Sequence, residues 1–148
     1  MKTLWIDHLH PFFPEWVALR QRVLRDPLGL HYSDEDLIAE QGDRHLVGFV
    51  GKTLSGGLVV SSRELPSDTL RIRQVAVEDA AQGMGIGRDL MLEAITRARE
   101  DGIQQILLHS RAPVIPFYEK LGFVSEGETF YEVGIPHRRM TLRLDRSS

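Results

Sequence analysis

The clearest candidate for chemistry in this chain is the stretch Gln82-Gly83-Met84-Gly85-Ile86-Gly87-Arg88. Its glycines alternate between an apolar run that ends at Val77 and a helical pattern that begins near Ile86. A strand that turns through glycines into a helix exposes backbone N–H groups at the positive end of the helix dipole, which suits an anion. A Cβ would hold a phosphate away from those amides. The pattern therefore predicts a site for a phosphate-bearing ligand.

Two nucleotide-binding motifs with similar glycine content are excluded by the residues that follow. A P-loop needs Lys-Ser or Lys-Thr after its last glycine to reach the phosphates and Mg²⁺, whereas Arg88-Asp89 stands there. The dinucleotide fingerprint G-x-G-x-x-G, started at Gly83, needs glycine where the chain has Arg88. Glycines that only shape a tight turn stay open as an alternative on this segment alone.

A second segment, Phe117-Tyr118-Glu119-Lys120-Leu121-Gly122-Phe123, follows about 30 residues later, after one expected helix and one expected strand. With the spacing Gln82-x-x-Gly85-x-Gly87 and the preceding Val75-Ala76-Val77, it resembles the GNAT family of acetyl-CoA-dependent N-acetyltransferases, whose coenzyme loop reads Arg/Gln-x-x-Gly-x-Gly/Ala. The resemblance covers residues 69–124 firmly and the flanks more loosely. Phe130-Tyr131-Glu132, followed by Gly134-Ile135-Pro136-His137 and Met140, is similar to the ElaA/YjcF-like subgroup of that family.

This resemblance implies acetyl-CoA as the co-substrate, with its pyrophosphate over the loop amides and Arg88 as a countercharge. The pantetheine arm would pair with the edge of strand 75–77, in a slot between that strand and 106–109. An N–H freed by a bulge near Ala76 and Val77 could stabilise the thioester oxyanion. The implied coenzyme-binding residues are Val75, Ala76, Val77, Gln82, Gly83, Met84, Gly85, Ile86, Gly87 and Arg88.

The resemblance also implies a primary amine of a small molecule or peptide as the acceptor. An alkylamine with a pKa near ~10.4 is mostly protonated at pH 7, so a base must remove its proton, directly or through water. Tyr118 stands where the family places the acid that protonates the leaving thiolate. The alternative for Tyr118 is a ring packed on the turn 121–123.

The base is less clearly marked. Some members of the family carry a glutamate in the strand before the loop, but here Arg71-Ile72-Arg73-Gln74 occupies that stretch. Glu132 and His137 flank a turn over 133–136 that could overhang the acceptor, and His137 has a suitable intrinsic pKa. They are the candidate bases. A loop histidine satisfied by backbone, or a water relay, are the alternatives.

The elements that position these residues follow from hydrophobic periodicity. We expect strands over 2–8, 45–50, 54–62, 69–78, 103–109 and 138–144, with one more entered at 122–124, and helices over 15–25, 34–40, 86–101 and 113–121. Leu70 and Ile72 are expected on one face of their strand and Val75 and Val77 on the other. Segment 125–137 is expected to be a loop that helps to select the acceptor.

The expected fold class is therefore α/β (α+β), with antiparallel hairpins early and a β-loop-α-β crossover in the middle. The resemblance implies the GNAT fold, a mixed and mostly antiparallel sheet flanked by helices, with the coenzyme at a splayed parallel strand pair. We expect one domain over residues 1–148.

Composition limits the partners. The chain has 148 residues, a net charge of −3 and no cysteine. Such a charge gives no footprint for nucleic acid, and no run approaches the ~20 apolar residues of a membrane span. Lack of cysteine excludes disulfides and a cysteine nucleophile, and fits a cytoplasmic monomer or homodimer. We expect no metal, since His8 and His10 have no third ligand nearby.

Three alternatives stay open at this point. The fold could serve as a non-catalytic acyl-CoA sensor, because the base assignment is incomplete. The enzyme could transfer a longer acyl group. Arg71 and Arg73 share a strand face and could recognise an acidic acceptor or simply face solvent.

Overall fold

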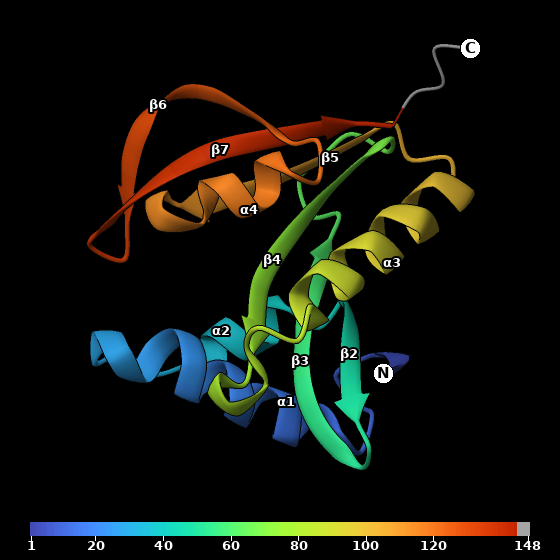
Figure 1. The fold of residues 1–148 in the computed structure, drawn as a ribbon, viewed down its shortest axis with the longest axis vertical. Helices are drawn as coiled ribbons and strands as arrows, with labels where there is room; N and C mark the ends of the chain where they lie inside the picture. The colour runs from blue at the N-terminus through green and yellow to red at the C-terminus, as the bar shows by residue number, and fades with distance from the viewer. Residues whose placement is uncertain (145–148) are drawn as a thin grey trace.

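The computed structural model describes residues 1–144 and contains a seven-stranded sheet of order β1-β2-β3-β4-β5-β7-β6 (Figure 1). Only β4 and β5 pair in parallel; the other neighbours are antiparallel. The strands are β1 (Lys2–Ile6), β2 (Arg44–Val50), β3 (Thr53–Ser61), β4 (Thr69–Val77), β5 (Gln105–Arg111), β6 (Val124–Glu132) and β7 (Ile135–Arg143). The expected mixed, mostly antiparallel sheet flanked by helices is confirmed.

The helices lie close to their expected ranges. They are α1 (Phe13–Arg20), α2 (Asp34–Ala39), α3 (Ile86–Glu100) and α4 (Ile115–Glu119), with a π-helical turn, Gln21–Arg25, that extends α1 and short 3₁₀ turns at Asp26–Leu28, Asp79–Ala81 and Ala112–Val114. Pro14 and Pro116 sit in the first turns of α1 and α4, where a missing N–H costs no helical bond. Ser33 caps α2 through a capping box with Asp36. In the described residues no helix is long and apolar enough to cross a membrane.

Two hydrophobic clusters form the core. The larger contains the apolar stripe of α3, with Ile86, Leu90 and Ala94, and reaches Tyr118 and Phe123. The smaller lies under α1 and includes Trp16 and Ala76. Gly57 lets Trp16 approach, because a Cβ there would lie 2.8 Å from the indole ring. Helices thus cover both faces of the sheet.

A bulge in β4 changes which residues face each cluster. Gly57 is opposite Ala76, but Val59 is opposite Arg73, so β4 carries one extra residue, and Gln74 adopts a φ of 53°. The sequence analysis considered a bulge near Ala76 and Val77, and the structure has one at Gln74, just before that run. The predicted facing of Val75 and Val77 is wrong: both pack on the same cluster as Leu70 and Ile72, because the extra residue reverses the alternation.

The parallel pair separates soon after it begins. Thr69–Arg71 pairs with Gln105–Leu107, and no further pairs follow. Beyond Arg71, the edge of β4 that faces β5 has no strand partner in residues 1–144, and the two strands diverge (Figure 1). This confirms the expected splay.

The segment predicted to be a loop over 125–137 is instead part of a long hairpin. β6 and β7 are joined at Val133 and Gly134, whose φ values of 47° and 79° suit a tight two-residue turn. The sequence analysis expected a strand entered at 122–124 but not its continuation to Glu132, because most residues of β6 are exposed and hydrophobic alternation is weak. His137 consequently lies in a strand and not in a loop.

Candidate active site

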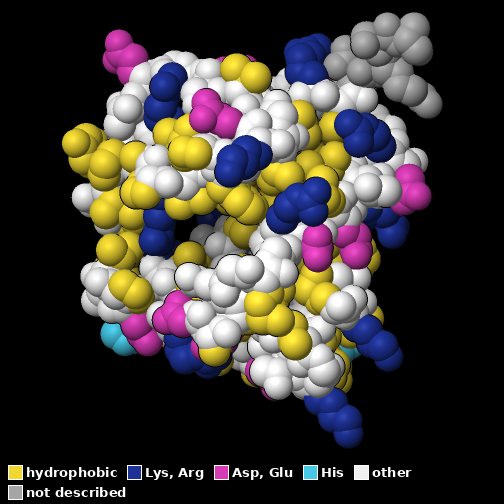
Figure 2. Space-filling model, viewed as in Figure 1, with side chains coloured by type: hydrophobic (Ala, Val, Ile, Leu, Met, Phe, Trp, Pro, Cys, Tyr) yellow, Lys and Arg dark blue, Asp and Glu magenta, His cyan; other side chains and the backbone are white. Residues whose placement is uncertain are grey.

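A cavity of about 510 Å³ opens where β4 and β5 diverge. Figure 2 shows the surface hollowed at this place, between the part of the molecule that holds α4 and β5 and the part that holds β4. Its wall comes from β4, β5, the turns after α1, α4 and the β6–β7 turn. The residues that matter for chemistry are Arg25, Arg71, Arg73, Gln74, Val75, His109, Arg111, Tyr118, Glu132 and His137. All three predicted catalytic side chains therefore face one cavity.

Glu132 lies at the centre of a cluster of polar side chains. Its Oε1 is 2.9 Å from Nδ1 of His109 and 3.9 Å from Nη2 of Arg71, and its Oε2 is 3.8 Å from Nε2 of His137. Burial raises the pKa of this carboxyl, but the hydrogen bond from His109 and the charges of His109, His137 and Arg71 outweigh it and hold the pKa below its usual range. Glu132 is therefore ionised at neutral pH.

Two side chains contact the Nδ1 atom of His109. Both Arg71 Nη2 and Glu132 Oε1 lie 2.9 Å from this nitrogen. Arginine can only donate and an ionised carboxylate can only accept, so one neutral tautomer cannot satisfy both. Burial, together with Arg71, lowers the pKa of His109 in spite of Glu132. A neutral ring with Nδ1–H toward Glu132 fits these charges and leaves Nε2 with a lone pair.

His137 has a fixed tautomer. Its Nδ1 is 2.9 Å from the carbonyl of Ile135, which can only accept, so Nδ1 carries a proton, and in the neutral form of the ring the lone pair is on Nε2. Phe130 stacks on the ring, with centroids 6.0 Å apart. The Nε2 lone pair and Glu132 Oε2 are then two acceptors 3.8 Å apart, an arrangement that a donor such as an ammonium group can bridge.

Tyr118 enters the cavity from α4. Burial raises the pKa of its phenol to about 12, partly offset by Arg111, so the group is protonated at neutral pH. Its ring packs edge-on against Phe117 and Phe123. The two sequence interpretations of Tyr118, an acid and a packing ring, are compatible in this geometry.

The glycine loop lies between the end of β4 and α3. Gly83 and Gly85 have φ values of 86° and 78°, which other residues rarely adopt, and open space surrounds the position of a Cβ at each. Within residues 1–144, no turn or side-chain hydrogen bond accepts from the amides of Gly83, Met84 or Gly85. The Arg88 side chain is exposed beside Asp89. Such free amides at a helix start can bind an anion.

Sequence reasoning missed His109. The residue ends the predicted strand 103–109, and a histidine at the end of a buried strand next to β4 was the available signal. It was overlooked because its partner Glu132 follows 23 residues later and joins it only through the β6–β7 hairpin. Among the described residues, no group of three or more His, Asp or Glu side chains could hold a metal ion.

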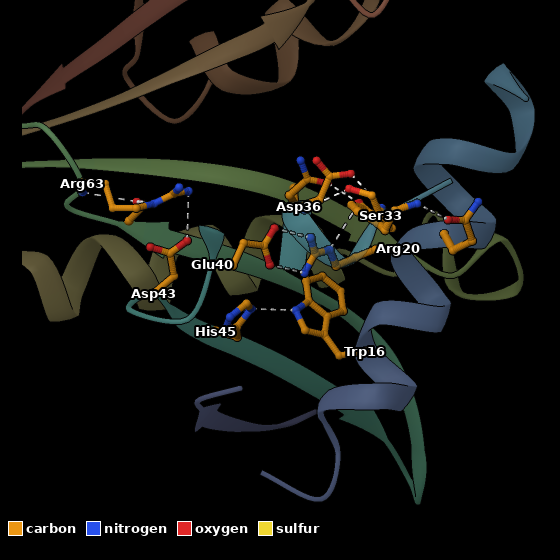
Figure 3. A network of polar contacts seen from close by, with 12 residues as sticks. Trp16, Arg20, Ser33, Asp36, Glu40, Asp43, His45 and Arg63 are labelled. Carbon is orange, nitrogen blue, oxygen red and sulfur yellow. Dashed lines mark hydrogen bonds and ion pairs between the residues drawn. The ribbon is translucent and has the colours of Figure 1, made fainter. Parts of the chain in front are cut away.

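A second polar cluster lies away from the cavity, between α1, α2 and β2 (Figure 3). Arg20 is fully buried and forms two hydrogen bonds with Glu40, of 2.9 and 2.6 Å. Trp16 Nε1 donates to Nδ1 of buried His45 at 3.0 Å. Burial lowers the pKa of His45 to about 4. This cluster lines no part of the cavity.

Comparison with known proteins gives a consistent result. Residues 31–144 match the family model described as an acetyltransferase (GNAT) domain. A putative acetyltransferase of Bacillus subtilis is 28% identical over 131 residues, which cover 86% of each chain.

Solved structures share the fold at low sequence identity. Escherichia coli ElaA superposes with a TM-score of 0.81 and 22% identity, covering 95% of this chain and 97% of that one. An aminoglycoside 6'-N-acetyltransferase complexed with coenzyme A also reaches 0.81, with 14% identity and coverage of 100% and 99%.

Proposed function

Because the chain belongs to the GNAT family of acetyltransferases and is therefore an acyltransferase, we propose that it transfers an acetyl group from acetyl-CoA to a primary amine. The acceptor is a small molecule or a peptide, and it attacks the thioester directly, since no cysteine is present to form an acyl-enzyme. Lack of cysteine also fits the proposed cytoplasmic location.

The residues predicted to bind the coenzyme fit that role. The free amides and positive-φ glycines of 83–85 suit its pyrophosphate. The edge of β4 from Val75 to Val77, which has no partner on the β5 side, suits the amides of its extended arm. In the proposed complex, Arg88 adds a countercharge and the bulge at Gln74 directs a β4 amide toward the thioester oxygen.

The acceptor side follows from the Glu132 cluster. We assign binding of the substrate ammonium to the gap between Glu132 Oε2 and His137 Nε2. His137 then takes the proton at Nε2, and Glu132, held by His109 and Arg71, stabilises the resulting positive charge. Tyr118, which burial keeps protonated and which lines the same cavity, donates to the leaving thiolate.

One observation carries this proposal: where β4 and β5 diverge, one cavity is lined both by a protonated tyrosine and by a carboxylate with two histidines. An acid and a base facing one space are what acyl transfer from a thioester to an ammonium requires.

The decisive experiment measures release of coenzyme thiol from acetyl-CoA with a panel of amines. A thiol reagent reports the coenzyme alone, because the protein has no cysteine. Turnover with at least one amine supports the proposal. Tight coenzyme binding in calorimetry without turnover of any amine would instead favour an acyl-CoA sensor, and mass spectrometry of co-purified coenzyme would reveal a longer acyl group.

Gly85→Glu is the matched variant for the donor side. It places a bulky negative side chain at a positive-φ position among the loop amides, so binding of acetyl-CoA should fall below detection in calorimetry. Near-normal affinity would refute the loop assignment. Glu100→Gln, at the other end of α3, is a control that should bind normally.

A further inference from the structure

The cavity wall carries an excess of positive charge. Four arginines line it, against the single carboxylate of Glu132: Arg25, Arg71, Arg73 and Arg111. The chain as a whole has a net charge of −3, so this is a local concentration and does not reflect a basic protein. A local excess of one charge in a cleft raises the concentration of ligands of the opposite charge.

Two of these arginines have unused hydrogen-bonding capacity. Arg73 makes no hydrogen bond or ion pair within residues 1–144, and Nε of Arg71 is buried without a partner. The others are occupied by neutral groups: Arg25 lies over the ring of Tyr32, 4.4 Å from its centroid, and Arg111 donates to the carbonyl of Leu24 at 3.2 Å. A buried donor such as Arg71 Nε normally has a partner.

The acidic side chains nearby are already committed elsewhere. Asp36 accepts from the backbone of Ser33 in the α2 capping box, and Asp43 pairs with Arg63 at 3.3 Å. Both carboxylate oxygens of Glu40 accept hydrogen bonds from Arg20. Arg73 interacts with the charges of Asp36 and Asp43, but neither carboxylate forms an ion pair or hydrogen bond with it within residues 1–144.

The coenzyme phosphates do not fill this role in the proposed complex. The glycine loop begins after the end of β4, whereas Arg71 and Arg73 lie in its first half. At about 3.3 Å per residue, the interval from Arg71 to Val77 spans roughly 20 Å. An anion bound at Arg73 must therefore come from the other substrate.

We propose that the amine acceptor is a small molecule that carries an anionic group, a carboxylate or phosphate, and that Arg73 and Arg71 bind it. This deepens the proposed function and rests on it. A simple alkylamine enters as a cation and is repelled by four arginines, whereas an acidic amine offers its ammonium to Glu132 and its anion to Arg73. Charge-assisted hydrogen bonds to guanidinium supply the selectivity.

The experiment compares amines that differ only in the anion: β-alanine with n-propylamine for carboxylate, and phosphoethanolamine with ethanolamine for phosphate. At least one acidic member should have a kcat/KM about 10- to 100-fold above its neutral partner. Arg73→Gln should remove most of that ratio, chiefly by lowering kcat/KM for the acidic amine. Arg97→Gln, an exposed arginine paired with Asp101 on α3, should leave the ratio intact.

The outcomes separate this inference from the proposed function. Turnover of neutral and acidic amines with equal kcat/KM, or a preference for diamines, overturns the inference and leaves acetyl transfer standing. If no amine is turned over, calorimetry with N-acetyl-β-alanine and N-propylacetamide in the presence of coenzyme A still tests it. Tighter binding of the acid that Arg73→Gln abolishes supports the inference, and equal or absent binding of both refutes it.

Discussion

The two polar clusters of this protein are built from similar side chains but differ in how completely they are closed. Arg20, Glu40 and His45 are fully or almost fully buried, and the carboxylate of Glu40 has a two-point partner (Figure 3). In the cavity, the Glu132 side chain is 42% exposed, and His109 has one nitrogen contested by two partners. A buried ion pair with satisfied geometry fixes structure, while an incompletely satisfied, accessible cluster can exchange protons with a substrate. We expect mutations in the first to change stability and mutations in the second to change catalysis.

The largest expected effect breaks the closed cluster. Glu40→Ala leaves the guanidinium of Arg20 buried without a counter-ion, and the free energy of unfolding should fall by about 3–5 kcal/mol. Urea denaturation followed by tryptophan fluorescence measures this loss. Replacing both partners with apolar residues, Arg20→Met with Glu40→Leu, should restore most of it; a loss below about 1 kcal/mol in the single variant would show that water reaches Arg20.

The next effect is the pH dependence that His45 gives to stability. Its folded pKa of about 4 lies below the usual ~6.5, so between these values the unfolded state binds the extra proton. Stability should therefore decrease by about 3 kcal/mol as the pH falls from 6.5 to 4. His45→Gln keeps an acceptor for Trp16 but does not titrate. Its stability should change less over the same range, and an unchanged pH dependence would contradict the assignment.

In the open region, Tyr118→Phe removes the proposed acid and keeps the ring that packs on Phe123. We expect kcat to fall by about 100-fold or more, with a similar KM for acetyl-CoA. Steady-state thiol release measures both constants. An unchanged kcat would show that Tyr118 only packs in the core and is not the acid.

For Glu132→Gln we expect the smallest change in stability, together with a clear loss of rate. With the side chain partly exposed, the free energy of unfolding should change by less than about 1 kcal/mol. The kcat/KM for the amine should fall by about 10-fold or more, because the ammonium loses its counter-ion. A large loss of stability with an intact rate would reverse the comparison between the two clusters.

The sequence predicted the local structure of the proposed coenzyme-binding residues better than that of the proposed amine-binding residues. Gly83, Gly85 and the start of α3 are neighbours in the chain, so local turn chemistry and helix periodicity locate them. A bulge in β4 was also considered, from the unbroken run at Val75. The prediction did not take into account that an extra residue shifts the alternation of side chains between the two faces of β4. The predicted facing of Val75 and Val77 was therefore wrong.

The acceptor half depends on contacts between distant segments. His109, Glu132 and Arg71 come from three strands, and the hairpin that brings Glu132 to His109 has weak alternation because most of β6 is exposed. Glu132 and His137 were predicted as candidates that flank a loop. In the structure they lie diagonally across the paired strands β6 and β7, with Glu132 opposite Ile135 and His137 opposite Phe130.

By itself, the sequence determined most of the order of helices and strands and the family to which the chain is similar, and it predicted an anion-binding glycine loop. These depend on periodicity and on residues close together in the chain. Only the tertiary structure decided that His109, Glu132 and Arg71 meet, that four arginines and one carboxylate line the cavity between β4 and β5, and that Arg20 and Glu40 form a buried pair elsewhere. Burial and distance set the charge and reactivity of these groups, and neither quantity is local in the chain.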